Sequence, residues 1–490
     1  MNRTRILVVV CLALFAETTA ADDWNQWRGS SRDGLAHESP TLLDALPAAG
    51  LPAVWIADKS IAAAQSGGWS SPIVAKGKVY LFAHKKTRLR EGAMPKQEFP
   101  WLPPEKRVGM SDDEYAEYEQ KRRDEDQIRA SFFRHEEFVY CLNADSGKVI
   151  WTHQRDSIYT RFPQSGSPTV IDGRLFFLGA GRMATCIDAV TGKDLWQRKL
   201  TGDFRDEFLQ SSVAIADGVA VVMCGSLFGL DTATGDVLWE GDKKTTRGTH
   251  SSPVIWGGTG RDLVIANVGN GDTICIDPRT GKELWRIRSE GGQSTPVIAG
   301  DRLITYGSSR KRGLRCFRLS SSEATHEWTF NGTADPGSSP VVVGGNVFVQ
   351  GDRRLACVDL ATGETRWNAT LDMARPQYTS LVAADNKVFY TFDSVLCFRA
   401  TSEGFRPLMT ALIDETGLLA DEAAFRRMLD LETLEETAEG QKESQRIWRK
   451  KFNNSGPLAC TSPAIADGKL FLRTKQGLAC FDLTAKPAAE

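Results

Sequence analysis

A nine-residue stretch that ends in tryptophan recurs along this chain with little change. It reads DAVTGKDLW at residues 188–196, DTATGDVLW at 231–239 and DPRTGKELW at 277–285. Six tryptophans that close such a stretch follow one another at intervals of 39 to 46 residues. A period of this size is typical of an architecture in which one supersecondary unit is repeated and buries its apolar face against the next copy.

A second marker has the same period. A Ser or Thr that opens a new apolar run lies 10 to 16 residues after each of the tryptophans. The markers are Ser71, Ser167, Ser212, Ser252, Thr295, Ser339, Ser380 and Ser462. Eight tryptophans precede them and are expected to pack between neighbouring units: Trp55, Trp151, Trp196, Trp239, Trp285, Trp328, Trp367 and Trp448.

Each unit contains four short segments with strand character. Residues 168–179 read PTVIDGRLFFLG, two apolar runs joined by Asp-Gly, which is a β-hairpin signal. A third run and a fourth run opened by the tryptophan complete the unit. We therefore predict an all-β chain that forms an eight-bladed β-propeller with four-stranded antiparallel blades. The last unit lacks a fourth strand, so the strand at 51–58 is expected to complete it and close the ring.

Two partly helical insertions interrupt the predicted propeller. The first, about 84–137, separates the second and third strands of blade one and contains a charged helix that starts at a Ser111/Glu114 capping box. Trp101 precedes this helix and either packs on the blade or meets a partner. The second, about 402–445, is expected between the third and fourth strands of blade seven, on the opposite face. Its apolar side either packs on its own domain or fits a partner, and comprises Phe425, Met428, Leu429 and Leu434.

Seven of the ten cysteines also follow the repeat. They share one third-strand position, which predicts small buried apolar side chains rather than disulfides, and their spacing matches no zinc site. Cys224 and Cys460 fall outside this column. The seven are Cys141, Cys186, Cys275, Cys316, Cys357, Cys397 and Cys480.

The first 20 residues have the character of a cleavable signal peptide. Arg3 and Arg5 precede a short apolar run, and Thr18 and Ala20 suit a cleavage site. We expect the propeller, residues 21–490, to be periplasmic or secreted and to have no transmembrane segment. A net charge of −2 without a basic stripe argues against a nucleic-acid partner.

The connections that enter each innermost strand are expected to line one mouth of the central channel. The residues just before the paired markers differ from unit to unit, which is typical of a binding surface on a constant frame. They either bind a ligand or face channel water, and include Trp69, Ser165, Gln210, His250, Gln293, Gly337, Tyr378 and Cys460. Four arginines in the same connections are candidates to hold an anionic group: Arg161, Arg205, Arg247 and Arg375. These positions contain neither a catalytic set nor metal-ligand spacing.

The repeated unit C-[ILV]-D-x-x-T-G-x-x-x-W resembles the tryptophan-docking motif of the pyrroloquinoline-quinone-like (PQQ-like) repeat β-propeller family. The resemblance covers nearly the whole mature chain. It implies kinship both with quinoprotein alcohol and glucose dehydrogenases and with non-enzymatic BamB-type proteins, so the fold does not decide the function. The dehydrogenases use PQQ with calcium, an aspartate base and, in some, a vicinal disulfide. This sequence has no Cys-Cys pair and no C-x-x-C-H haem site.

Three functions remain open at this point. We expect a non-catalytic binding or scaffold protein of the cell envelope, without a cofactor, whose partner is an envelope protein or a glycan. The first alternative is a PQQ- and calcium-dependent dehydrogenase. The second is a glycan-binding propeller, which a shared aromatic platform of Trp69, Tyr378 and Trp101 would favour.

Overall fold

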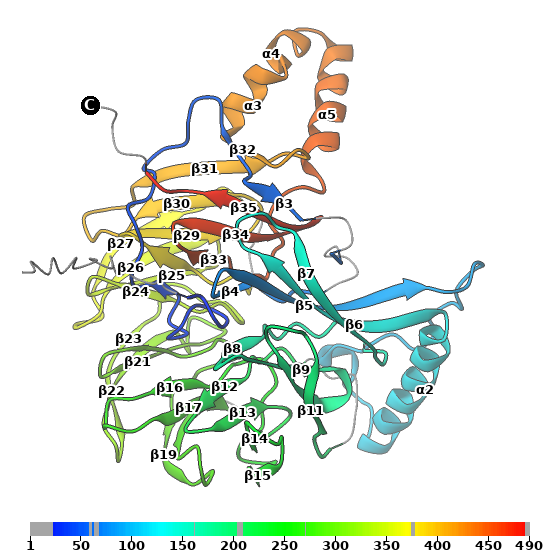
Figure 1. Cartoon of the computed structure of the whole chain (residues 1–490), viewed down its shortest axis with the longest axis vertical. Coiled ribbons are helices and arrows are strands. Elements are labelled where there is room, and N and C mark those ends of the chain that lie inside the picture. The colour runs from blue at the N-terminus through cyan, green and yellow to red at the C-terminus, as the bar shows by residue number, and fades with distance from the viewer. Residues whose placement is uncertain are drawn as a thin grey trace, which may run out of the picture.

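The computed structural model describes residues 23–57, 61–62, 68–160, 162–202, 209–269, 271–373 and 378–485. Short antiparallel sheets stand around a central axis, as in a β-propeller (Figure 1). Seven sheets have four strands and a further sheet has seven. The prediction of eight four-stranded blades is therefore wrong, because the blades of that form number seven. The predicted signal peptide, residues 1–20, lies outside the described residues.

The four-stranded blades follow the repeat along the chain. Six of them are continuous in sequence. The first two blades comprise β4 (Ile73–Ala75), β5 (Lys78–Arg88), β6 (Phe133–Asn143) and β7 (Val149–Asp156), and then β8 (Thr169–Ile171), β9 (Arg174–Gly179), β10 (Met183–Asp188) and β11 (Asp194–Lys199). The next two comprise β12 (Ala214–Ala216), β13 (Val219–Met223), β14 (Leu227–Asp231) and β15 (Val237–Glu240), and then β16 (Val254–Trp256), β17 (Leu263–Val268), β18 (Asp272–Ile276) and β19 (Glu283–Arg288). The last two comprise β20 (Val297–Ala299), β21 (Arg302–Tyr306), β22 (Leu314–Leu319) and β23 (Ala324–Phe330), and then β24 (Val341–Val343), β25 (Asn346–Gly351), β26 (Arg354–Asp359) and β27 (Thr365–Thr370).

The seventh four-stranded blade joins the two ends of the chain. It is built from β33 (Ala464–Ala466), β34 (Lys469–Thr474), β35 (Gly477–Asp482) and the N-terminal strand β3 (Trp55–Ile56). Trp55 lies opposite Cys480 in the antiparallel pair. The expected closure by the N-terminal strand is confirmed, and it covers the outer edge that β35 would otherwise expose.

The seven-stranded sheet shows why the repeat is not uniform. Its central strands are β28 (Val382–Ala384), β29 (Lys387–Thr391), β30 (Val395–Arg399) and β31 (Pro407–Ile413). At the inner edge β1 (Leu35–Ala36) pairs in parallel with β28. At the outer edge β32 (Leu418–Ala420) and β2 (Leu51–Pro52) continue the sheet. Both additions come from segments outside the repeat, so the repeat period alone did not predict them.

The recurring tryptophan and glycine meet at the contacts between neighbouring blades. On the fourth strand of each four-stranded blade, the tryptophan faces a third-strand cysteine, or Gly229 in one blade. The Trp196 indole packs on Gly235 in the next Thr-Gly turn, where φ is +75° and a β-carbon would lie 2.6 Å from the ring. Its Nε1 donates to the Thr232 carbonyl at 3.0 Å. Only glycine suits both the backbone and the indole there, so the motif links blade to blade.

The predicted apolar role of the cysteine column agrees with its burial. All seven of its side chains are fully buried, and the nine cysteines in the described part of the chain are free thiols.

Trp448 does not belong to the series of blade tryptophans. It lies in α5 (Ala438–Phe452), where its ring is 4.3 Å from that of Phe452. In the seven-stranded sheet Met409 takes the position opposite Cys397. The spacing to Ser462 was therefore misleading, because a helix rather than a strand spans that distance.

The second insertion consequently starts after the fourth strand, β31, and not before it. It carries β32, α3 (Glu422–Met428), α4 (Leu431–Leu434) and α5, which project from the rim (Figure 1). The predicted position between the third and fourth strands is therefore wrong, because β31 already pairs with β30 as the fourth strand. Phe425 packs on Phe452 within the insertion, while Met428 is exposed.

The first insertion lies between the second and third strands, as expected, but is shorter. Strands β5 and β6 stay paired as far as Arg88 and Phe133, and the connection contains η1 (Pro104–Lys106) and α2 (Asp112–Ala130). Ser111 and Glu114 form the predicted capping box. In the described part of the chain, we find no helix long and apolar enough to cross a membrane.

Candidate functional site

The repeated Ser/Thr markers form a hydrogen-bonded ring around the channel. In seven of the eight markers the backbone N–H donates to the hydroxyl oxygen of the next marker at 2.9 or 3.0 Å, and among the described residues the link from Ser380 to Ser462 is the exception. These bonds join, in order, Ser71, Ser167, Ser212, Ser252, Thr295, Ser339 and Ser380, and join Ser462 to Ser71. Near Ser380, the Cys460 N–H donates to Thr379 Oγ1 at 2.9 Å. The regular spacing of the markers therefore has a structural cause: the hydroxyl groups link the inner connections of neighbouring blades.

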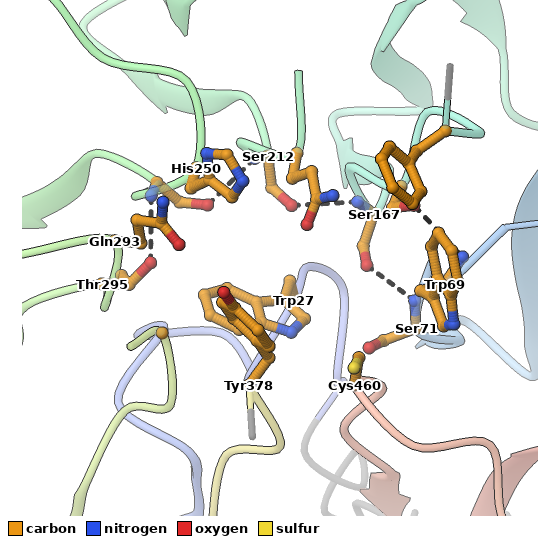
Figure 2. A pocket seen from close by; sticks show the side chains of 15 residues that line it. Trp27, Trp69, Ser71, Ser167, Ser212, His250, Gln293, Thr295, Tyr378 and Cys460 are labelled. Atoms are coloured by element: carbon orange, nitrogen blue, oxygen red, sulfur yellow. Dashed lines mark hydrogen bonds between the residues drawn. The ribbon is translucent and has the colours of Figure 1, made fainter. Parts of the chain in front are cut away.

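A cavity of about 470 Å³ lies above this hydroxyl ring. All the predicted mouth residues that precede the markers line it: Trp69, Ser165, Gln210, His250, Gln293, Gly337, Tyr378 and Cys460. Figure 2 shows that they converge from different blades on one space. The volume is that of an ordinary small-molecule site, and the role of these residues in binding stays a prediction.

Only one of the four candidate arginines, Arg247, is among the described residues. Arg247 is exposed and is not part of the cavity lining. Arg161, Arg205 and Arg375 lie outside the described residues.

Sequence reasoning missed two lining residues, Phe162 and Trp27. Trp27 comes from an N-terminal segment, residues 24–36, that runs into the channel and that we call the plug. The backbone of Trp24 accepts from Val74 N–H at 2.8 Å, and that of Asn25 accepts from Val170 N–H at 2.8 Å. The plug places the Trp27 ring in the cavity (Figure 2). The only sequence signal was the aromatic pair in WNQWRG, which precedes the first repeat.

Two buried arginines hold the plug to the innermost strands. Arg32 donates to the carbonyls of Pro253 and Val213, each at 2.7 Å. Arg28 donates to Pro340 O at 2.5 Å and Leu381 O at 3.2 Å, and its guanidinium lies 5.8 Å from the Trp27 ring centre. Burial lowers the pKa of Arg28 to about 10 and that of Arg32 to about 9. Trp27 therefore rests on a fixed support and not on a mobile tail.

Aromatic side chains form one part of the cavity wall. Trp69 and Phe162 are in contact, with ring centres 6.4 Å apart. Tyr378 and Phe162 are each 37 % exposed. Tyr378 and Cys460 have φ values of +64° and +70°, a region that costs non-glycine residues energy. Two such conformations at one mouth are typical of a site whose geometry is functionally constrained.

Uncharged polar groups form another part. His250 Nδ1 lies 2.7 Å from Thr249 Oγ1, and burial lowers its pKa to about 4. Burial, followed by the charge of Asp335, raises the pKa of the Cys460 thiol to about 11. Both groups are therefore neutral at pH 7. With Gln210 and Gln293, they give a cavity wall that hydrogen-bonds without net charge.

A second cavity of about 390 Å³ lies beside the first, under the first insertion. Trp101 lines this cavity and not the one that contains Trp69 and Tyr378, so the three do not form a single platform. Phe162 lines both cavities. The two therefore adjoin at Phe162, and the insertion extends the mouth surface as expected.

The described lining does not suit PQQ with calcium. Calcium prefers several oxygen ligands that include carboxylates, and no carboxylate is among the described residues that line the first cavity. The nearby Asp335 is 1 % exposed; its Oδ1 accepts from the N–H groups of Gly337, Ser338 and Tyr378, and its Oδ2 accepts from Gln350. Across the described ranges, no group of three or more His, Cys, Asp or Glu residues could hold a metal ion.

Comparison with known proteins gives one family and several relatives. The profile of the family described as outer membrane protein assembly factor BamB matches residues 135–367 and 250–417. The assembly factor BamB of Salmonella typhimurium is 22 % identical over 359 residues, which cover 67 % of this chain and 87 % of that protein. A polyvinylalcohol dehydrogenase of Sphingopyxis is 26 % identical, but over only 31 % of this chain and 30 % of that protein.

Solved structures agree with the fold. The quinohemoprotein alcohol dehydrogenase of Pseudomonas putida HK5 superimposes with a TM-score of 0.56 at 12 % identity, covering 96 % of this chain and 82 % of that one. The corresponding enzyme of Comamonas testosteroni has a TM-score of 0.55 at 11 % identity, with the same coverage. At such identities the likeness shows the fold alone. The profile match extends over more than half of the chain, and the protein therefore belongs to the BamB family of PQQ-like repeat β-propellers.

Proposed function

We propose that this protein is a non-catalytic recognition protein of the cell envelope. Its contact surface is the mouth of the channel, with the first insertion beside it. The periplasm or the cell exterior is the proposed location, because the sequence begins with a predicted signal peptide and its relatives are named as outer membrane protein assembly factors.

The chemistry of the mouth cavity is the observation that supports this proposal best. Four aromatic side chains, two primary amides and a neutral histidine surround it, and Trp27 rests on a fixed support. Such a concave, prebuilt and partly apolar wall is suited to holding a ligand. General acid–base catalysis near pH 7 needs a group that titrates near that pH, whereas His250 and Cys460 titrate far from it.

The dehydrogenase alternative has a direct test. Purified protein is titrated with PQQ in the presence and absence of calcium, and binding is followed by absorbance and calorimetry. The proposal expects no calcium-dependent binding. Saturable binding together with oxidation of an alcohol in the presence of an electron acceptor would overturn it.

Recognition at the mouth is tested by site-specific cross-linking. A photoreactive phenylalanine derivative is placed at Phe162 in cells that export the protein, and adducts are identified by mass spectrometry. Leu238, which is 49 % exposed on the outer strand β15, provides the control position. We expect adducts from position 162 that disappear in Tyr378→Ala and are absent from position 238. Equal adducts at both positions would contradict the proposal.

A further inference from the structure

The mouth cavity has chemically different sides. Figure 2 shows His250 and Gln293 on one side and Trp69 on the other, with Trp27 and Tyr378 below the open space. From this arrangement we propose that the cavity binds an uncharged sugar ring, a neutral pyranose of an envelope glycan. This inference rests on the recognition function proposed above and names the ligand class of the same site.

The aromatic groups suit the faces of such a ring. A pyranose presents C–H groups on its faces, and these are apolar enough to lie against indole and phenol rings. Trp27 is supported from behind by Arg28, and Trp69 is held against Phe162 at 6.4 Å. Tyr378 is 37 % exposed although it occupies a costly backbone conformation. An occupant that covers these rings removes apolar surface from water without requiring the wall to move.

The amides suit the hydroxyl groups at the ring's edge. Each glutamine side chain offers two donors and one acceptor, and a sugar hydroxyl both donates and accepts. Among the described residues, the side chains of Gln210 and Gln293 have no hydrogen-bond partner. They face the cavity from different blades. A purely apolar guest, such as an aromatic side chain of a protein, would use the aromatic wall and leave both amides unpaired.

The described part of the wall provides no cationic partner for an acidic sugar. The described lining contains no arginine or lysine that would pair with a carboxylate. Moving a carboxylate from water into such a site costs free energy unless a cation compensates it. A neutral pyranose carries no such cost, and the 470 Å³ cavity lies in the range of small-ligand sites.

The experiment compares neutral and acidic trisaccharides. Maltotriose, triacetylchitotriose and trigalacturonate are titrated into the purified full chain, followed by calorimetry and tryptophan fluorescence. We expect saturable binding of at least one neutral trisaccharide and at least tenfold weaker binding of trigalacturonate. Tyr378→Ala and Gln293→Ala should each weaken binding of the neutral sugar at least fivefold. Leu195→Ala, which truncates a half-exposed side chain on the outer strand β11, should leave it unchanged.

The outcomes separate this inference from the recognition function. If no neutral trisaccharide binds, or if trigalacturonate binds as well, the sugar assignment is wrong. If the Phe162 adducts are then still lost in Tyr378→Ala, recognition at the mouth stands with another ligand class. If neither sugars nor position-specific adducts are found, both proposals fail. Thermal unfolding of Tyr378→Ala and Gln293→Ala, expected within about 2 °C of the parent, shows whether a loss reflects the site and not the fold.

Discussion

The ring of Tyr378 lies against Gly337, in the space that a β-carbon at residue 337 would occupy. Gly337→Ala should therefore push the ring out of its place at the mouth. We expect weaker capture at the mouth, similar in size to that of Tyr378→Ala, with the free energy of unfolding changed by less than about 1 kcal/mol because the ring is partly exposed. Adduct yield at position 162 and chemical denaturation measure the two effects.

The double variant Gly337→Ala/Tyr378→Ala gives the matched control. If the glycine acts only by making room for the ring, the double variant should capture no less than Tyr378→Ala alone, since the two effects are not additive. Fully additive losses would show that Gly337 acts by another route.

Truncation of a blade tryptophan should destabilise the whole ring. Trp196→Ala removes an indole that packs on the next blade and donates to Thr232, so we expect a loss of about 3 kcal/mol or more. Trp196→Phe should recover most of this loss, because it restores the packing and lacks only the hydrogen bond. Guanidinium unfolding followed by circular dichroism is the measurement.

Trp448→Ala is the informative comparison, because Trp448 packs on Phe452 inside the helical insertion. We expect it to loosen α5 locally, detectable by hydrogen exchange, while the main unfolding midpoint stays within 0.2 M guanidinium of the parent. A global loss as large as that of Trp196→Ala would mean that the insertion and the ring unfold as one unit.

Removal of the Arg32 guanidinium should loosen the plug and with it the part of the cavity wall that Trp27 forms. Arg32→Met keeps most of the volume but leaves the carbonyl of Pro253 without this donor, at a cost of about 1 to 3 kcal/mol for a buried group, whereas the carbonyl of Val213 still accepts from Thr169 Oγ1. We expect faster proteolysis of residues 24–36 and a shift of tryptophan emission from Trp27. Arg279→Met, whose ion pair with Asp217 lies at the surface, should change neither quantity.

Acid should weaken the fold through its buried imidazoles. Burial lowers the pKa of His250 and that of His135 to about 4 each, below the ordinary 6.5. Between pH 6.5 and 4 the unfolded chain therefore binds more protons than the folded chain, so stability falls as the pH falls through this window. The upper bound is about 3 kcal/mol for each residue.

His250→Gln should remove the contribution of one imidazole to this dependence of stability on pH. The measurement is the unfolding midpoint between pH 7 and 4.5. Gln293→Ala, a neighbour at the same mouth that does not titrate, should keep the full slope. Equal slopes in the parent and His250→Gln would show that the imidazole is not the acid-sensitive group.

The local sequence predicted most of the ring, because each blade is made by residues close together along the chain. Asp172 and Gly173 turn the β8–β9 hairpin with φ values of +49° and +75°, as Asp-Gly between apolar runs predicts. The mouth positions followed from the same logic, since they come just before markers that precede the inner strands by two residues. Repetition at a fixed period carried this information.

What the sequence did not predict depends on contacts between distant segments. β1 joins the seven-stranded sheet by pairing with β28, more than 340 residues later. Trp448 has the right distance to Ser462 but the wrong conformation, and Met409 fills the vacant position opposite Cys397. The place of Trp27 depends on the carbonyls that Arg28 and Arg32 reach, and no local pattern encodes those partners.

The plug is synthesised long before the residues that hold it, and this order has a consequence for assembly. Arg28 is made early, yet it donates to Leu381, 353 residues further along. The carbonyl groups that hold the plug are therefore not all present until almost the whole ring has been translated. Contacts between residues so far apart in the sequence form slowly. Trp27 reaches its position only in a finished molecule. Capture of the proposed ligand against Trp27 therefore requires a ring that is complete and correctly closed.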